Sequence, residues 1–347
     1  MNCLIVSPFE NWSTGRGNRN TLIAEELVAK GHLVEFFTTN FDHSKKQKIP
    51  TSLELVDGIK VTTINVPGYK KNISFLRLAT HIYFAFRLQI FLVTKKFDSI
   101  YMSSIPPEML AIKQLKDCNL IIDVRDIWPD ALIRYNKNRG NLLIKLGFFY
   151  LKFYYKNYLK NAKKIIVVAD SYKAWVEQYT SKKAQKIPLG FRTLNTVPHS
   201  ANFSYYFYAG GLTPQFDLTE FRNLIGDDLI VIAGSGPLFD HYKGIFPNIK
   251  MLGVIDKREC DQWLLSASIL LFPSNPFACL PNKAFDYYAS RKPIAFGSNI
   301  SDDVCDLFKI RSSGSIQLKE NYFEAAVMEK FSQTNCVKRI VKEIEES

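Results

Sequence analysis

Residues 280–297 read LPNKAFDYYASRKPIAFG and combine a helix with the strand that follows it. The pattern predicts a helix that begins at an Asn282 cap and stops before Pro293, because proline disfavours helical backbone in the residue that precedes it. Residues 294–296 then form a short apolar strand. A helix that leads directly into an apolar strand is the repeating unit of an α/β fold.

The start of this helix has the features of an anion site. With Asn282 as the cap, the backbone N–H groups of Lys283 and Ala284 are open to an anion, which the helix dipole also attracts. Lys283 and Asp286 are three residues apart, so they share one helix face and can bind a phosphate and a sugar hydroxyl of one molecule. These features predict a nucleoside diphosphate as the ligand. The alternative, a solvated ion pair on an amphipathic helix, stays open.

The alternation of strand and helix runs through the whole chain. A strand at residues 3–6 is followed by a loop and then by a helix from about residue 20 to 30. Further short apolar runs lie at residues 33–37, 59–66, 99–102, 120–124, 165–168, 203–208, 229–233, 249–252 and 269–272. The pattern predicts an α/β protein with two doubly wound, Rossmann-like domains that bind ligands in the cleft between them, at the carboxyl ends of strands.

The chain is long enough for both domains. Its 347 residues are 47% hydrophobic, which suffices for two cores. The polar stretch at residues 191–202 separates the two halves. We expect an N-terminal domain at residues 1–195 and a C-terminal domain at residues 196–347, and we leave open whether the last helix packs back on the first domain.

Cysteine and histidine usage gives no sign of a metal site. The six cysteines include no Cys-x-x-Cys pair, and the five histidines have no metal-ligand spacing. No basic region precedes the first apolar run, so no secretory signal is visible. Residues 78–93 contain His81, Arg87 and Gln89 and make a poor membrane-spanning segment. We expect a cytoplasmic protein without a metal or a cofactor.

Positive charge is concentrated in the first half of the chain. Residues 1–170 contain 25 Lys or Arg against 14 Asp or Glu, whereas residues 171–347 contain 20 against 19. An anionic partner should therefore meet the first half. The pI is near 9.2, but no recognition motif accompanies the charge, so we do not expect nucleic acid as the partner.

One basic segment also contains many aromatic residues. Residues 131–169 include nine Lys or Arg and no acid. On a helix, Lys152, Lys156 and Lys160 would form a basic stripe beside aromatic side chains, which suits the surface of an anionic membrane. The alternative is a core helix whose aromatic residues pack inward.

A second informative motif, DVRDIWPD at residues 123–130, follows the predicted strand at residues 120–122. Its position at a strand's carboxyl end is where α/β sheets form their sites. At such a site Arg125 could stabilise developing negative charge, and Asp126 could position a hydroxyl. The alternative, an Asp–Arg ion pair with a helix cap at Asp126, is compatible with these roles.

Glycine turns provide further candidate donor contacts. Gly15 and Gly17 lie in the first loop, where the lack of side chains permits a sugar to approach closely. Gly234 and Gly236 follow the predicted strand at residues 229–233. The first loop lacks the third glycine and the acid of a dinucleotide fingerprint, so we do not expect a dehydrogenase.

These motifs resemble those of glycosyltransferase family four, a family of retaining sugar-nucleotide transferases with the GT-B fold. Residues 280–297 are similar to its Pro-x-Lys-x-x-Glu-Tyr-x-Ala-x-x-Lys-Pro signature, with Asp286 in place of the glutamate. The family's earlier glutamate falls on Ala278. Residues 123–129 match the Asp-x-Arg-Asp-x-Trp-Pro element of bacterial enzymes that build surface polysaccharides.

The resemblance also covers the second half of the chain. Residues 187–191 look like the element that precedes the family's second domain, and Gly211 lies in its glycine-containing first turn. The basic pair that usually follows this turn is missing from residues 213–217, so Lys283 would carry more of the phosphate charge. Val254 and Ile255 occupy the place where the family's backbone contacts the nucleotide base.

The resemblance implies a hexosyltransferase-type enzyme that retains the anomeric configuration of a nucleotide-sugar donor. The implied acceptor is a saccharide or a lipid-linked saccharide in bacterial surface polysaccharide assembly, at the inner face of the membrane. Two alternatives stay open. One is a sugar-nucleotide epimerase of the same fold, and the other is a catalytically degenerate GT-B protein that only binds a partner.

Overall fold

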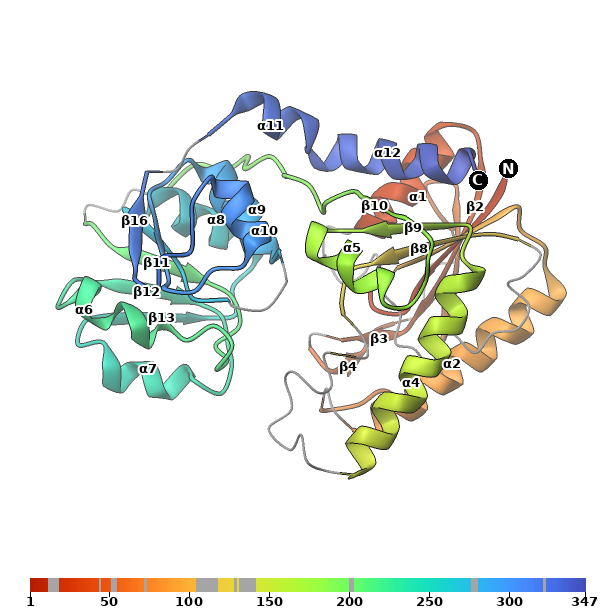
Figure 1. Ribbon diagram of the computed structural model, residues 1–347, viewed down its shortest axis with the longest axis horizontal. Helices are drawn as coiled ribbons and strands as arrows, with labels where there is room; N and C mark the ends of the chain where they lie inside the picture. The colour runs from red at the N-terminus through yellow and green to blue at the C-terminus, as the bar shows by residue number, and fades with distance from the viewer. Residues whose placement is uncertain are drawn as a thin grey trace. The chain divides into compact units, whose positions relative to one another are not determined.

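The computed structural model describes residues 1–11, 19–43, 45–50, 55–71, 74–103, 118–127, 130, 142–199, 203–275, 280–320 and 323–347. The chain forms two compact units (Figure 1). Unit 1 comprises Met1–Pro188 with Thr334–Ser347, and unit 2 comprises Leu189–Gln333. Phe191 lies in unit 2, where its backbone N–H donates to the Phe331 carbonyl at 2.8 Å and its ring packs in the core. The division therefore precedes the expected boundary after residue 195.

Unit 1 contains an eight-stranded sheet in the order β10-β9-β8-β7-β1-β2-β6-β5. Its strands are β1 (Asn2–Ser7), β2 (Leu33–Thr39), β5 (Leu55–Val56), β6 (Ile59–Ile64), β7 (Ser99–Ser103), β8 (Asn119–Val124), β9 (Lys164–Val167) and β10 (Ala184–Lys186). All neighbours are parallel except β5 and β6. β3 (Phe41–Asp42) and β4 (Gln47–Lys48) form a separate antiparallel pair. The central strands are buried on both faces, which explains their nearly continuous apolar sequences.

Helices connect the strands of unit 1. They are α1 (Arg19–Ala29), α2 (Phe75–Thr94), α4 (Leu142–Asn161) and α5 (Asp170–Glu177). Crossovers between parallel strands are right-handed, so the strand order places α2 and α4 on the face of the sheet opposite to α1. Figure 1 shows this arrangement.

The last helix, α12 (Gln333–Glu345), packs on unit 1 beside α1 (Figure 1). Its apolar face, which includes Val337, Ile340 and Ile344, is buried. Two ion pairs fix its far end: Glu343 with Lys164 at 2.8 Å, and Glu345 with Lys30 at 2.7 Å. The C-terminus of the chain is therefore part of the N-terminal unit.

Unit 2 contains a six-stranded sheet in the order β13-β12-β11-β14-β15-β16. Its strands are β11 (Tyr206–Ala209), β12 (Ile230–Ala233), β13 (Ile249–Gly253), β14 (Ile269–Phe272), β15 (Ile294–Phe296) and β16 (Gln317–Lys319). Only β16 is antiparallel to its neighbour among these described strands. Its helices are η4 (Leu218–Phe221), α6 (Arg222–Ile225), α7 (Phe239–Ile245), α8 (Lys257–Ser266), α9 (Asn282–Ser290), α10 (Asp302–Phe308) and α11 (Ala325–Lys330).

Two apolar clusters pack on the sheet of unit 2. One contains Phe207, Phe272 and Tyr287, and the other contains Tyr208, Phe221 and Tyr242. Side chains of neighbouring residues in a strand point to opposite faces, which explains why Phe207 and Tyr208 belong to different clusters. The predicted fold class, two Rossmann-like α/β units with mostly parallel sheets, is confirmed.

Candidate functional site

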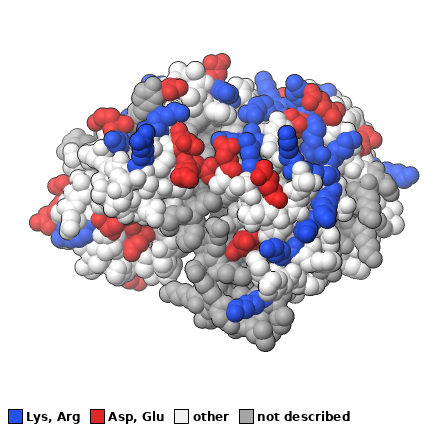
Figure 2. All heavy atoms as spheres, viewed as in Figure 1, with Lys and Arg blue, Asp and Glu red and all other residues white. Residues whose placement is uncertain are grey.

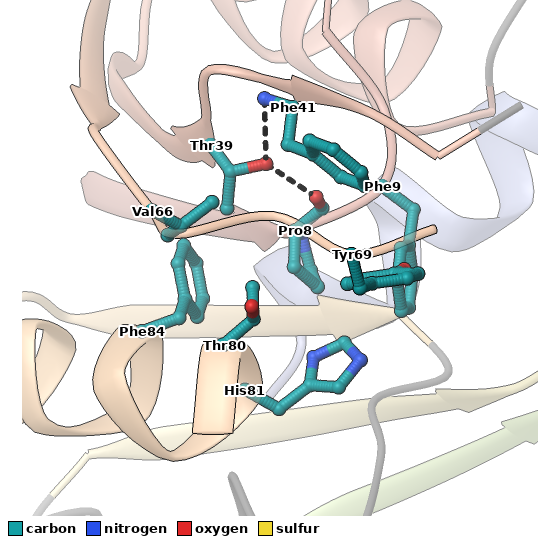
Figure 3. Close-up of a pocket in the computed structure, with 9 residues that line it drawn as sticks. All are labelled: Pro8, Phe9, Thr39, Phe41, Val66, Tyr69, Thr80, His81 and Phe84. Carbon is teal, nitrogen blue, oxygen red and sulfur yellow. Dashed lines mark hydrogen bonds between the residues drawn. The ribbon is translucent and has the colours of Figure 1, made fainter. Parts of the chain in front are cut away.

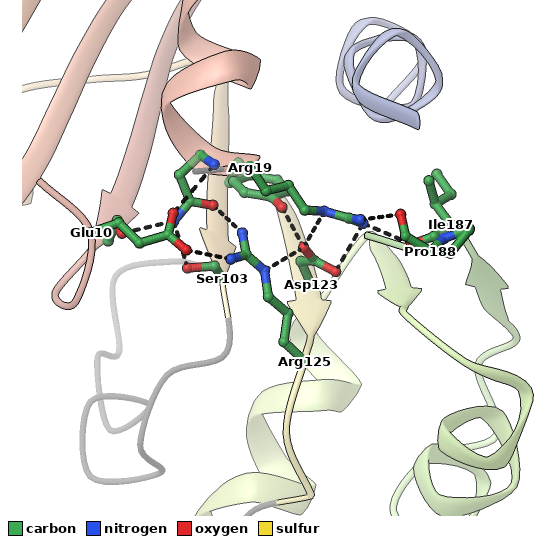
Figure 4. A network of polar contacts seen from close by, with 10 residues as sticks. Glu10, Arg19, Ser103, Asp123, Arg125, Ile187 and Pro188 are labelled. Atoms are coloured by element: carbon green, nitrogen blue, oxygen red, sulfur yellow. Dashed lines mark hydrogen bonds and ion pairs between the residues drawn. The ribbon is translucent and has the colours of Figure 1, made fainter. Parts of the chain in front are cut away.

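A buried carboxylate, Asp123, lies at the carboxyl end of β8, and three polar side chains meet at one of its oxygens (Figure 4). Arg19, the first residue of α1, places its Nε 2.9 Å from this oxygen. Tyr101 in β7 donates its hydroxyl at 2.6 Å, and Arg125 donates its Nε at 3.0 Å. Two guanidinium groups and a phenol thus compensate the buried charge of Asp123.

Arg125 extends this network to the start of α1. Its Nη1 donates to Glu10 Oε1 at 2.6 Å, and its Nη2 donates to the side-chain oxygen of Asn20. Asn20 in turn donates to the hydroxyl of Ser7 at 2.7 Å and to that of Ser103 at 2.9 Å. One guanidinium therefore connects the carboxyl ends of three neighbouring strands, where open α/β sheets bind their ligands.

The surroundings of Tyr101 and Arg125 shift the pKa values of both side chains upward. Burial raises the pKa of Tyr101, and the charge of Asp123 raises it further, so the phenol stays protonated. Burial by itself would lower the pKa of Arg125, but Glu10, Tyr101 and Asp123 raise it well above its usual range. The guanidinium therefore stays charged over the physiological pH range.

The two predicted catalytic residues have different environments. Arg125 is mostly buried and donates from three of its nitrogens, whereas Asp126 is exposed. Asp126 Oδ1 accepts the backbone N–H of Ile127 at 2.9 Å. The ion pair between Asp123 and Arg125, which the sequence left as an alternative, is present. Residues 128–129 of the motif lie outside the described part of the chain.

In unit 2, the turns after β11 and β12 pack too closely for side chains. A Cβ atom on Gly234 would lie 1.9 Å from the carbonyl oxygen of Gly210, and one on Gly236 would lie 2.2 Å from that of Leu212. The candidate residues Gly211, Gly234 and Gly236 thus come together at the carboxyl ends of two neighbouring strands.

Lys283 reaches these turns from the first turn of α9. Its Nζ donates to the Tyr208 hydroxyl at 2.9 Å and lies 4.2 Å from the ring centres of Tyr208 and Phe216. A Cβ atom on Gly210 would be 3.1 Å from the same nitrogen. The aromatic rings hold the ammonium beside exposed glycine backbone, an arrangement that suits a phosphate.

Asp286, the other charged residue of the motif, belongs to an ion-pair network. Arg192 Nε lies 2.7 Å from one of its oxygens, and Lys257 Nζ lies 2.6 Å from the other. Arg192 also donates its Nη1 to Asp261 at 2.5 Å. A sugar hydroxyl would therefore meet the carboxylate of Asp286 together with two cations.

The predicted cap of α9 was wrong by one residue. Pro281, not Asn282, is the cap, and Asn282 is the first helical residue. The backbone N–H of Ala284, which was expected to face an anion, donates to the Pro281 carbonyl at 2.9 Å. Proline has an extended conformation here (φ −69°, ψ 151°), so its carbonyl closes the first turn in place of a side-chain cap. The helix ends at Ser290, before Pro293, as predicted.

The remaining candidates for donor binding are two residues after β13 and two glycines outside the described residues. Val254 is 80% exposed after β13, whereas Ile255 packs against the core of unit 2. Gly15, Gly17 and Ala278 lie outside the part of the chain that the structure describes.

Glu220 has a structural role that no sequence pattern indicated. Its carboxylate accepts the backbone N–H of Ser274 at 2.6 Å and that of Ser298 at 3.1 Å. It also accepts the Ser274 hydroxyl at 2.8 Å. These contacts hold together the segments that follow β14 and β15, beside the glycine turns in the sheet order. Glu220 therefore positions the carboxyl end of the sheet.

The basic stripe of α4 lies on the surface of unit 1. Lys152, Lys156 and Lys160 are exposed, as are Phe149 and Phe153. The opposite side of the helix, with Leu151, Tyr155, Tyr158 and Leu159, is buried. Figure 2 shows Lys and Arg side chains along the course of this helix. The aromatic residues of α4 are thus divided between the core and the surface.

Metal coordination has no candidate in the described ranges. Among those residues, no group of three His, Cys, Asp or Glu side chains is placed to hold an ion. Lys283, which lies beside the glycine turns of unit 2, is a described cation that could balance the charge of a diphosphate.

Comparisons with known proteins agree with the fold and the motifs. Three solved structures are similar over nearly the whole chain. Sucrose-phosphate synthase from Thermosynechococcus elongatus has a TM-score of 0.65 and 13% identity, with 99% of this chain and 94% of that chain covered. The E. coli structure described as trehalose-6-phosphate bound with UDP-2-fluoro glucose has a TM-score of 0.66 and 10% identity, with 100% and 99% covered. WaaG, a glycosyltransferase involved in lipopolysaccharide biosynthesis, has a TM-score of 0.60 and 12% identity, with 99% and 90% covered.

The fold is therefore the GT-B fold of glycosyltransferases. The family model for glycosyltransferase family 4 matches residues 15–193, more than half of the chain, and the chain belongs to this family. No curated protein matched the chain by sequence. The family match identifies a glycosyltransferase and argues against the epimerase alternative.

Proposed function

We propose that the protein is a retaining glycosyltransferase of the hexosyltransferase type, which moves a sugar from a nucleoside-diphosphate sugar to an acceptor hydroxyl. The observation that carries the proposal is the position of Lys283, whose ammonium lies against the glycine turns after β11 and β12. A diphosphate at this point would meet a cation, glycine backbone and the N-terminal end of α9. The UDP-2-fluoro glucose in the similar E. coli structure supports a nucleotide sugar as the donor.

Unit 1 would bind the acceptor. In a retaining transfer without a covalent intermediate, the leaving diphosphate must be stabilised while the acceptor hydroxyl attacks the same face of the sugar. The exposed carboxylate of Asp126 would position that hydroxyl. Arg125 would hold Glu10 at the carboxyl ends of the strands and supply positive charge.

A lipid-linked saccharide in bacterial surface polysaccharide biosynthesis is the acceptor that the sequence favours. The motif at residues 123–129 and the basic first half of the chain support it. WaaG, which is involved in lipopolysaccharide biosynthesis, has a similar fold. The protein would then lie in the cytoplasm as a peripheral protein of the inner membrane face, with Lys152, Lys156 and Lys160 against anionic head groups.

Thermal-shift measurements with UDP, GDP and ADP, followed by their sugar conjugates, test the donor. One nucleoside diphosphate and its sugar conjugate should raise the melting temperature, because a ligand that binds only the folded state stabilises it. No stabilisation by any of these ligands would contradict the proposal. A degenerate binding protein, favoured by Ala278 and by the missing basic pair, would bind the conjugate without hydrolysing it.

A further inference from the structure

Helix α2 has two apolar faces, but only one of them is packed against other described residues of unit 1. The inner face packs on the sheet with Thr80, His81, Phe84, Ala85 and Leu88, all of which are buried. The outer face is an apolar line with a spacing of three or four residues. It consists of Phe75, Ala79, Ile82, Phe86, Ile90 and Val93.

The large side chains of this outer line are unusually exposed. Their exposed fractions range from 46% at Ile90 to 84% at Phe75. A helix on the surface of a soluble protein normally has polar residues on its outer face. Within the described ranges, α2 is also the one helix whose length and composition would permit it to cross a membrane. Contiguous exposed apolar surface of this kind usually marks an interaction site.

The charged residues of the segment that carries this line are all basic. Residues 58–97 contain no acid. Lys70 and Lys71 are exposed before the helix, Arg87 is exposed on it, and Lys96 is exposed after it. An apolar face with basic residues at both ends is the composition of helices that lie in the head-group region of anionic membranes.

We propose that the outer face of α2 inserts into the surface of an anionic lipid bilayer and, together with α4, forms the membrane-binding surface of unit 1. This proposal rests on the proposed function, since a lipid-linked acceptor requires the enzyme to reach the membrane. The helix lies on the bilayer and does not span it. It is the crossover between β6 and β7, and its inner face is packed on their sheet.

The alternative occupant, a second copy of the chain, fits the charges poorly. Two outer faces packed together would bring Lys70, Lys71, Arg87 and Lys96 close to their counterparts, and like charges at an interface oppose association. Phospholipid head groups would instead compensate them. α2 and α4 also lie on the same face of the sheet, so one surface can contact both (Figure 1).

The inner face of α2 connects this surface with the candidate site of unit 1. Thr80, His81 and Phe84 line a cavity of about 10 Å³ together with Phe9 and Tyr69 (Figure 3). Burial, with a further contribution from Arg77, lowers the pKa of His81, so this residue is neutral there. Phe9 precedes Glu10, the partner of Arg125. A lipid at the outer face would be separated from Phe9 by one helix, whose diameter is about 10 Å.

Co-flotation with vesicles tests the proposal. The wild-type protein should float with phosphatidylcholine vesicles that contain phosphatidylglycerol, and part of the binding should persist at high salt, because insertion of apolar side chains is not screened. I82E/F86E should bind at least about tenfold more weakly at both salt concentrations. The neutral variant I82S/F86S should lose mainly the salt-resistant part. L318E changes an exposed leucine of unit 2 to the same charge and should float like the wild type.

Two outcomes would overturn the proposal. The first is wild-type flotation of both double variants. The second is a wild-type dimer in sedimentation velocity that I82S/F86S converts to a monomer, because the face would then bind a second copy. Thermal shifts with UDP, GDP and ADP on the same samples report folding. They also separate this proposal from the proposed function, because a protein that binds vesicles but no nucleotide contradicts only the latter.

Discussion

At the scale of single residues, charge is placed in two separate networks with different characters. In unit 1, Arg125 donates to Asp123 in β8, to Glu10 after β1 and to Asn20 at the start of α1, so it fixes the positions of these residues and also supplies positive charge. In unit 2, Lys283 is held by aromatic rings beside glycine backbone. We therefore assign diphosphate binding to Lys283 and the arrangement of the acceptor site to Arg125.

Lys283→Ala should weaken binding of the cognate nucleoside diphosphate by ~1.5–3 kcal/mol, the usual contribution of a hydrogen bond to a charged group. Asp286→Ala should weaken it less, because that carboxylate acts within a network of cations. Isothermal titration calorimetry gives both values. Lys243→Ala, which removes an exposed lysine of α7, is the matched control. Unchanged affinity in Lys283→Ala would contradict the donor site.

Arg125→Ala should lower turnover about 100-fold, as is typical when a group that stabilises developing charge is removed. Donor affinity should change little, because the donor contacts assigned here belong to unit 2. Arg125→Lys keeps the charge but cannot donate to three acceptors at once, so it should restore only part of the activity. Arg311→Ala, at an exposed position, is the control. A raised Michaelis constant at unchanged turnover would show that Arg125 contributes ordinary binding.

At the scale of helices and strands, side chains of one element bind neighbouring elements and fix their positions. Glu220 joins the segments after β14 and β15, and the acids of α12 fix that helix to unit 1. Such contacts determine how accurately the carboxyl ends of the strands are placed. They also make element positions sensitive to single substitutions.

Glu220→Gln should destabilise unit 2 by about 1–3 kcal/mol, because an amide nitrogen replaces one carboxylate oxygen and cannot accept the N–H group of Ser274 or Ser298 that this oxygen binds. Urea unfolding followed by circular dichroism measures the change. Asp240→Asn, which removes an exposed acid of α7, should be near neutral. The assigned role would be wrong if the two variants had the same midpoint.

The attachment of α12 should weaken in acid. The hydrogen bond from Lys30, with a contribution from His32, lowers the pKa of Glu345 below its ordinary value of 4.5. For Glu343, burial acts in the opposite direction, but Lys164 and Gln185 give a net decrease of the pKa. An acid with a lowered pKa stabilises the fold above its unfolded-state pKa, and the contribution is lost as the pH falls through the folded-state value.

Near pH 7, the free energy of unfolding of E343Q/E345Q should therefore be about 1 kcal/mol lower than that of the wild type. The variant should accordingly melt at a lower temperature. The difference should shrink as the pH falls below 4.5, where the wild-type acids become protonated. Melting curves followed by circular dichroism between pH 7 and 3 test this. Glu346→Gln, in the exposed pair with Lys342, should have almost no effect. A difference in melting temperature that stays constant with pH would contradict the role assigned to these two acids.

At the scale of the whole molecule, the fold was predictable and the networks were not. Strand and helix positions follow from local patterns, because each buried strand is itself an apolar run. Lys283 was found because its motif lies within one helix. Arg192 was missed because its partner Asp286 is 94 residues away, and Glu10 because it is 115 residues from Arg125. No spacing rule along a sequence reveals such contacts, since tertiary folding alone brings these residues together.

We propose that this two-unit protein transfers a sugar from a nucleotide sugar with retention of the anomeric configuration. Proton NMR of donor hydrolysis, recorded on the sugar conjugate that gives the largest thermal shift, tests it most directly. We predict that the sugar is first released with the anomeric configuration of the donor and that Lys283→Ala releases it more slowly at limiting donor concentration. Release of the opposite anomer, or the absence of any donor turnover by a protein that binds the donor and is supplied with candidate acceptors, would contradict this proposal.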